Sequence, residues 1–117
     1  MILINVTASN TVAKRLMIAE TSLTRLIGLL GKKQLAPGCG LLIRPSAGVH
    51  TFGMLFPIDV VALSKDLRVL RLWRALAPYR MTGLSLKTYS VLELPAGQID
   101  ASNLKVGDQL KLRDRGL

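Results

Sequence analysis

The chain has 117 residues, of which 50% are hydrophobic and 20% charged, and this composition is typical of one folded domain rather than of a disordered segment. Its net charge of +9 comes from sixteen Lys and Arg against seven Asp and Glu, but the basic residues are scattered, and no block of like charges marks a nucleic-acid-binding tail. The aromatic residues are one Trp, two Tyr and two Phe, which offer little for base stacking. We therefore expect a single, generally basic domain over residues 1–117, with a nucleic-acid partner disfavoured.

The first part of the chain predicts a β-hairpin and then a short helix. Residues 2–7 alternate in polarity and are rich in β-branched side chains, so they predict a strand, and residues 12–19 predict the returning strand. Ser22 is a good helix cap, and apolar residues follow it at helical spacing. The sequence therefore predicts one short helix near residues 22–30, which ends at Gly31.

The remainder of the chain predicts short strands separated by turns. The clearest signal is the hairpin VVALSKDLRVLRL, whose turn is Ser64–Asp66. Together these patterns predict an α+β, mostly β fold, with a compact antiparallel, barrel-like sheet and one short helix. The predicted strands cover residues 41–44, 50–56, 58–63, 67–73, 88–94 and 109–113, and residues 98–104 predict one helical turn.

Targeting and membrane signals are missing from the sequence. The N-terminus MILINVTASN lacks the basic region of a secretory signal. The longest uncharged run, residues 45–58, contains two prolines and two glycines and is too short to span a bilayer. Cys39 is the single cysteine and cannot form an internal disulfide, which fits a reducing compartment. We therefore expect a cytoplasmic protein with no membrane span.

The sequence contains no recognisable metal or nucleophile motif. His50 and Cys39 are the only soft ligands, and they occur without a CxxC or HxxxH spacing. Cys39 lies between two glycines, where a small apolar loop residue is a simpler interpretation than a reactive thiol. The segment GLLGKK (28–33) lacks the spacing of a phosphate-binding P-loop. We therefore predict no catalytic residue, no metal and no cofactor.

The stretch GVHTFGMLFPIDVVAL (48–63) holds the most informative polar residues. In a strand, His50, Phe52, Met54 and Phe56 share one face. That face could line a pocket with a polar mouth, or it could be core with a hydrogen-bonded histidine. The candidate ligand-binding residues are Arg44, His50, Thr51, Phe52, Met54, Asp59 and Glu93.

Asp59 and Glu93 are carboxylates within otherwise apolar segments. Burial of an unpaired charge is unfavourable, so Arg25 and Arg44 are candidate ion-pair partners. Two such carboxylates could also form a general acid/base pair. An ion pair that stabilises the fold is the interpretation we favour.

Four ordered segments resemble a known family. TRLIGLL (24–30) is similar to R-x-x-G-L-M, GLLI (40–43) to G-M-L-F, HTFGMLFPIDVV (50–61) to H-T-F-x-M-x-F-P-I-D-V-V-F, and VLELPAG (91–97) with VGD (106–108) to V-L-E-L-P-A-G and V-G-D. On these motifs the chain resembles the domain of unknown function 192 family over about residues 20–110. It departs from the pattern at Leu30, where Met is usual, and at Ala62, where Phe is usual.

The resemblance implies a compact, mostly β domain with a short helix. It implies no established reaction, cofactor or catalytic residue. Many members carry an N-terminal signal peptide, and we expect none in this sequence.

Three functions are consistent with these patterns. The first is a non-catalytic module that binds a small anionic or apolar molecule, or a peptide, along the face from His50 to Phe56. An alternative is a hydrolase-like enzyme that uses Asp59, Glu93 and His50. A further alternative is a basic interaction protein for nucleic acid or an acidic partner, carried by Arg68, Arg71 and Arg74. Strand alternation already places Arg71 opposite the other two arginines.

Overall fold

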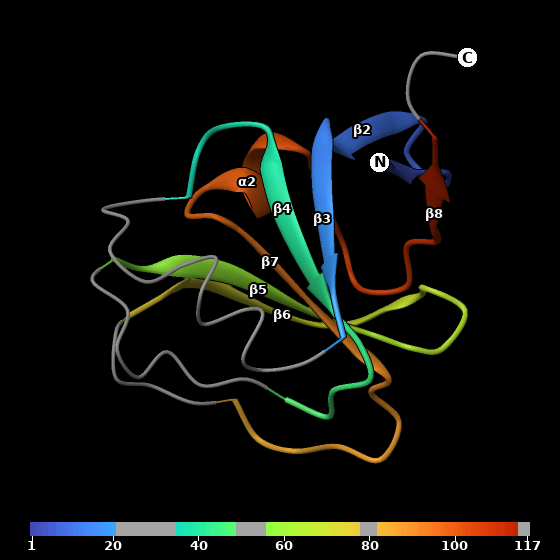
Figure 1. The fold of residues 1–117 in the computed structure, drawn as a ribbon, viewed down its shortest axis with the longest axis vertical. Coiled ribbons are helices and arrows are strands. Elements are labelled where there is room, and N and C mark those ends of the chain that lie inside the picture. The colour runs from blue at the N-terminus through green and yellow to red at the C-terminus, as the bar shows by residue number, and fades with distance from the viewer. Residues whose placement is uncertain (21–34, 49–55, 78–81, 115–117) are drawn as a thin grey trace.

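The computed structural model describes residues 1–20, 35–48, 56–77 and 82–114, and these ranges contain eight strands in two sheets and one short helix (Figure 1). The predicted α+β, mostly β class is confirmed, although the described strands form two sheets rather than one closed barrel. The three-stranded sheet has the order β2-β1-β8, with β1 (Ile2–Asn5), β2 (Asn10–Ala13) and β8 (Leu110–Arg113). The five-stranded sheet has the order β3-β4-β7-β5-β6, with β3 (Arg15–Ala19), β4 (Cys39–Ile43), β5 (Ile58–Leu63), β6 (Val69–Leu76) and β7 (Ser90–Pro95).

The predicted single strand over residues 12–19 is wrong, because the chain passes from one sheet to the other within it. β2 ends before Lys14 and pairs antiparallel with β1, whereas β3 begins after Lys14 and pairs parallel with β4. The N–H groups of Lys14 and Arg15 both donate to the carbonyl of Gly38, at 2.9 and 3.0 Å. These two hydrogen bonds fix the crossing beside the start of β4. The parallel β3–β4 pair also departs from the predicted antiparallel sheet.

Gly40 on β4 allows the backbones to approach closely at this crossing. A Cβ atom at Gly40 would lie 3.2 Å from side-chain atoms of Ala13, Leu16 and Leu94. Real Cβ contacts are rarely so short. Glycine is therefore the residue type that lets β2, β3 and β7 meet against β4.

The predicted hairpin of β5 and β6 is confirmed. The two strands pair antiparallel, with Val61 opposite Leu72. Every residue of β5 is buried, because β5 lies between β7 and β6 and both of its faces are covered. This explains why its sequence is almost continuously apolar.

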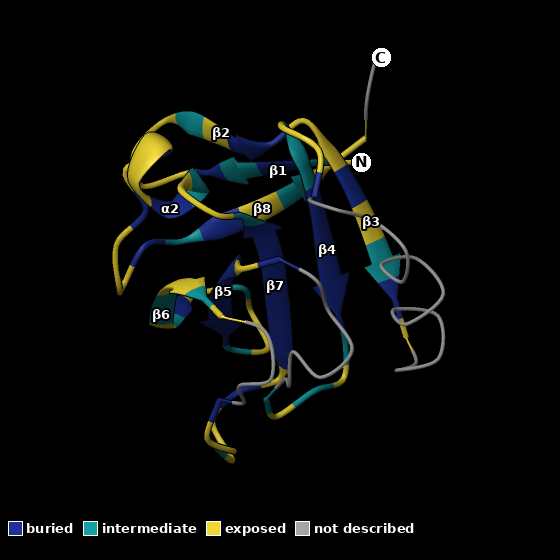
Figure 2. Ribbon diagram, turned by 90° about the vertical axis from the view of Figure 1, so that its left-hand side faces the viewer, coloured by how far each residue is buried: buried dark blue, intermediate teal, exposed yellow. Residues whose placement is uncertain are grey.

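The five-stranded sheet buries a different apolar cluster on each face, and Figure 2 shows its strands β4 and β7 as mostly buried. Both clusters exclude water from the sheet, and each fully buried aliphatic side chain stabilises the fold by about 1.5–3 kcal/mol. The first core cluster joins the two sheets and consists of Leu3, Val12, Ala13, Leu16, Leu42, Val61, Leu63, Val69, Leu92, Leu94, Ile99, Leu104 and Leu110. The second core cluster covers the opposite face and consists of Ala19, Leu35, Leu41, Ile43, Phe56, Ile58, Val60 and Val91.

The described helix is α2 (Gln98–Ala101), where the sequence predicts a helical turn. Gly97 precedes it with a φ of 96°, a left-handed conformation that favours glycine. The helix predicted near residues 22–30 lies outside the described residues. So does most of the strand predicted at 50–56, and its last residue, Phe56, is described but is not in a strand. Among the described helical residues, no segment has the length and apolar character of a bilayer span.

Candidate functional site

Asp59 on β5 is fully buried, and its carboxylate accepts three backbone hydrogen bonds. Oδ1 accepts from Ala75 N–H at 2.8 Å, and Oδ2 accepts from Gly97 N–H at 3.1 Å and Ile99 N–H at 2.8 Å. Hydrogen bonds to an ionised acceptor are stronger than neutral ones. Backbone amides therefore hold this buried carboxylate, and among the described residues no ion pair with Arg44 accompanies them.

The position of Asp59 gives it a structural role at the start of α2. The first N–H groups of a helix have no acceptor within the helix, and Gly97 provides no side-chain cap. Asp59 accepts two such N–H groups from 38 and 40 residues away in sequence. A single carboxylate thus connects β5, β6 and α2.

Glu93 on β7 is also fully buried, but it lies on the other face of the sheet. Cross-strand partners share a face. Glu93 is opposite Val60 of the second core cluster, whereas Asp59 is opposite Leu94 of the first. The two carboxylates therefore do not face each other, as the alternative of a general acid/base pair would require. Glu93 has a polar or electrostatic partner of its own.

The other predicted ligand-binding residues are only partly within the described residues. Arg44 directly follows β4, is half-buried, and donates its N–H to the carbonyl of Ala19 at 2.9 Å. Four other predicted residues lie outside the described residues, namely His50, Thr51, Phe52 and Met54. The same is true of the candidate ion-pair partner Arg25.

The three arginines of the predicted basic patch each have a separate contact. Arg68 donates from Nη1 to the carbonyl of Gly107 at 2.9 Å. The guanidinium of Arg71 lies 4.5 Å from the centroid of the Trp73 ring. Arg74 forms an exposed ion pair with Asp100 at 2.9 Å. Each of the three arginines therefore contacts a different neighbour.

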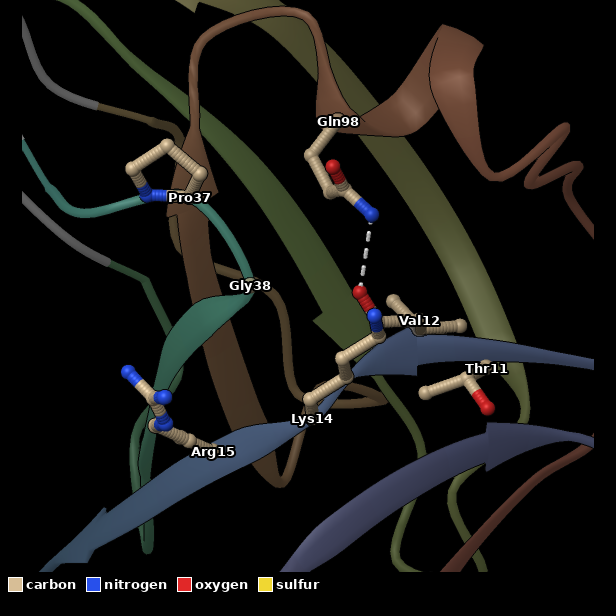
Figure 3. Close-up of a pocket in the computed structure, with 7 residues that line it drawn as sticks. All are labelled: Thr11, Val12, Lys14, Arg15, Pro37, Gly38 and Gln98. Carbon is tan, nitrogen blue, oxygen red and sulfur yellow. Dashed lines mark hydrogen bonds between the residues drawn. The ribbon is translucent and has the colours of Figure 1, made fainter.

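A cavity of about 460 Å³ lies where the chain crosses between the sheets (Figure 3). Figure 3 shows Lys14 and Arg15 at the crossing, Gln98 at the start of α2 above them, and Gly38 to the side. Gln98 donates from Nε2 to the carbonyl of Val12 at 2.9 Å. The lining residues are Thr11, Val12, Lys14, Arg15, Pro37, Gly38 and Gln98.

The cavity lining carries two positive charges and no acidic residue. All seven Asp and Glu of the chain fall within the described residues, and none of them lines the cavity. Lys14 and Arg15 are both exposed, and no ion pair with either is found among the described residues. Two adjacent cations without counter-ions attract small anions. Within the same residues, no three His, Cys, Asp or Glu side chains gather to hold a metal ion.

The sequence did not identify this cavity. Its two cations occur together in VAKRL, but adjacent Lys and Arg residues are common on protein surfaces. The cavity requires Lys14, Gly38 and Gln98 to meet, and these come from three distant segments. A sequence signal was available only in the glycines of PGCG, which allow close approach of the backbone.

The fold places this chain in a class of small two-sheet domains, and solved structures share this fold. A protein of unknown function from Novosphingobium aromaticivorans superposes with a TM-score of 0.79 at 22% identity, covering 95% of this chain and 83% of that one. A "putative transcription regulator" from Sinorhizobium meliloti superposes with a TM-score of 0.76 at 22% identity, covering 94% and 89%. These likenesses establish the fold.

The family follows from the sequence comparison. Residues 4–112 match the model of the domain of unknown function 192 family, described as "Uncharacterized ACR". A UPF0127 protein of Thermococcus sibiricus is 34% identical over 116 residues, covering 92% of this chain and 72% of that protein. The chain belongs to the domain of unknown function 192 family, as its motifs predict.

Proposed function

We propose that this protein is a non-catalytic binding module whose ligand is a small molecule carrying a carboxylate or phosphate group. The observation that supports this function is the cavity beside Lys14 and Arg15, which has two cations and no acid in its lining. Thr11 and Gln98, which carry neutral hydrogen-bonding groups, also line the cavity. A few polar groups that converge in a pre-formed pocket are typical of small-ligand sites.

This proposal keeps the predicted ligand class but moves the site. The predicted binding face was His50 to Phe56 with Arg44 at its rim, and only Arg44 and Phe56 of that face are described. The hydrolase-like alternative has less support, because Asp59 and Glu93 lie on opposite faces of one sheet. Asp59 also has its carboxylate occupied by three backbone amides.

A cytoplasmic location is part of the proposal. Cys39 is a free thiol, which fits a reducing compartment. The name of the Sinorhizobium meliloti structure raises a role in transcription, but the separate contacts of Arg68, Arg71 and Arg74 do not support a shared phosphate-binding surface. Titration with duplex DNA at two salt concentrations would test that alternative.

The experiment is a titration of the isotope-labelled protein with inorganic phosphate and with citrate, followed by amide chemical shifts. We expect the shifts to be largest at Lys14, Arg15, Gly38 and Gln98. The double variant Lys14→Gln/Arg15→Gln should bind at least about tenfold more weakly, because charged hydrogen bonds contribute roughly 1.5–3 kcal/mol each.

The matched control is Lys111→Gln/Arg113→Gln, which removes two exposed charges from β8. This variant should bind both anions as the unchanged protein does. Equal weakening in the two double variants would mean that net charge alone attracts the anions, and the proposed site would then be wrong.

A further inference from the structure

The segment before β7, residues 82–89, displays three large apolar side chains to solvent. Leu86 is 106% exposed, Leu84 is 82% exposed and Tyr89 is 38% exposed. Within the described part of the chain, the other exposed large apolar residues lie on separate segments: Met1, Val6, Met17 and Val106. Isolated exposed apolar residues are normal, but a gathered group marks an interaction surface.

The segment holds these side chains outward while its ends are fixed. Thr82 and Thr88 are buried. Tyr89 N–H donates to the carbonyl of Leu63 at 2.9 Å, and Ser85 N–H donates to the carbonyl of Ala47 at 3.2 Å. Because both ends are attached to neighbouring segments, the exposure of the leucines is a property of the fold.

Lysines flank the exposed leucines. Lys87 follows Leu86 directly and is exposed. The Lys65 ammonium lies 5.7 Å from the centroid of the Tyr89 ring, a cation–π contact that places its charge beside the segment. Asp66 follows Lys65 in the sequence. Its pKa is lowered by a hydrogen bond from the Ser64 hydroxyl, by its own backbone amide and by the charge of Arg68, so it contributes one negative charge beside the two lysines. The surface is therefore apolar at its centre and mainly basic at its rim.

We propose that residues 82–89 dock the protein on an anionic phospholipid surface. Figure 1 shows the segment as the orange loop at the lower end of the molecule, away from the three-stranded sheet. Leu84 and Leu86 enter the boundary between headgroups and acyl chains, and Lys65 and Lys87 bind lipid phosphates. Apolar insertion combined with basic flanks is the arrangement that holds peripheral proteins on negatively charged membranes.

The experiment measures sedimentation of the full chain with vesicles of phosphatidylcholine alone and of phosphatidylcholine mixed with phosphatidylglycerol. We expect the protein to sediment with the mixed vesicles only. Leu84→Ser/Leu86→Ser should weaken this binding at least about tenfold, because two apolar side chains no longer enter the interface. Lys65→Gln/Lys87→Gln should weaken it as well.

Two double variants serve as matched controls. Met17→Ser/Val106→Ser removes two exposed apolar side chains elsewhere, and Lys111→Gln/Arg113→Gln removes two charges from β8. Both should bind mixed vesicles as the unchanged protein does, and circular dichroism should show all variants folded.

The proposal is overturned if the protein does not sediment with mixed vesicles, or if the Leu84→Ser/Leu86→Ser variant sediments as the unchanged protein does. It is also overturned if the leucines are needed for self-association in solution and not for vesicle binding, since the surface would then fit a second copy of the chain.

Discussion

At Asp59, a buried carboxylate is satisfied by three amide groups that belong to β6 and to the start of α2. The sequence indicated that Asp59 and Glu93 are buried, because each interrupts an apolar segment. It could not indicate the partners of Asp59, because a backbone N–H group has no signature in the sequence. The prediction of Arg25 or Arg44 as a partner rested on charge alone; at Asp59 the described hydrogen bonds come from three backbone amides, and Arg25 lies outside the described residues.

We expect Asp59→Asn to lower the free energy of unfolding by roughly 3 kcal/mol or more. The new amide group would place N–H donors against the N–H groups of Gly97 or Ala75, so buried donors would lose their acceptors. Urea unfolding followed by circular dichroism measures the change. The control is Asp100→Asn, which removes an exposed ion pair and should change the free energy by less than about 1 kcal/mol. Equal effects at Asp59 and Asp100 would contradict the structural role of Asp59.

At the scale of elements, the strand positions were more predictable than their pairing. Alternation and turn residues located most strands, and the β5–β6 hairpin was specified locally by its turn. The change of sheet at Lys14 was not recognised, because Lys14 and Arg15 interrupt the apolar pattern without a Gly, Pro, Asn or Asp residue to mark a turn. The parallel pairing of β3 with β4 depends on tertiary contacts around Gly40. The cavity was unpredictable for the same reason, because this crossing forms it.

We expect Gly40→Ala to destabilise the protein by roughly 1–3 kcal/mol, because the added methyl group would overpack a filled region. It would lie 3.2 Å from atoms of Ala13, Leu16 and Leu94. Gly83→Ala is the matched control, since its Cβ would meet nothing within 4 Å. That control should change stability by no more than about 0.5 kcal/mol. Chemical denaturation of both variants compares them directly, and a larger effect at Gly83 would disprove the account of the crossing.

At the scale of the molecule, the first core cluster connects the two sheets. Leu3 of β1 and Leu110 of β8 share it with Leu42 and Leu92 of the five-stranded sheet. The sequence identified these residues as apolar strand positions, but it could not assign them to one of two sheets. The hydrophobic pattern of the sequence indicates which side chains are buried. The choice between one barrel-like sheet and two packed sheets depends on which strands pair over long distances in the sequence.

We expect Leu3→Ala to lower the free energy of unfolding by roughly 2–5 kcal/mol. Because Leu3 is fully buried where the two sheets meet, both sheets should lose stability in a single transition. Hydrogen exchange of β1 and β7 amides under denaturant measures this coupling. Val106→Ala, at a residue that is 63% exposed, should leave exchange unchanged. Faster exchange in β1 alone would show that the sheets unfold independently.

The buried carboxylates of Asp59 and Glu93 determine which face of β5 and β7 points to which core cluster, a choice that hydrophobicity alone does not make. β5 and β7 carry apolar side chains on both of their faces. A shift of their pairing by one residue would turn each apolar side chain from one apolar cluster to the other, and hydrophobic burial alone would distinguish the two registers only weakly. Such a slip would turn Asp59 toward the second core cluster, away from the amides of Ala75, Gly97 and Ile99. It would likewise turn Glu93 toward the first. The two carboxylates therefore favour one register of the central strands β5 and β7 over the registers shifted by one residue.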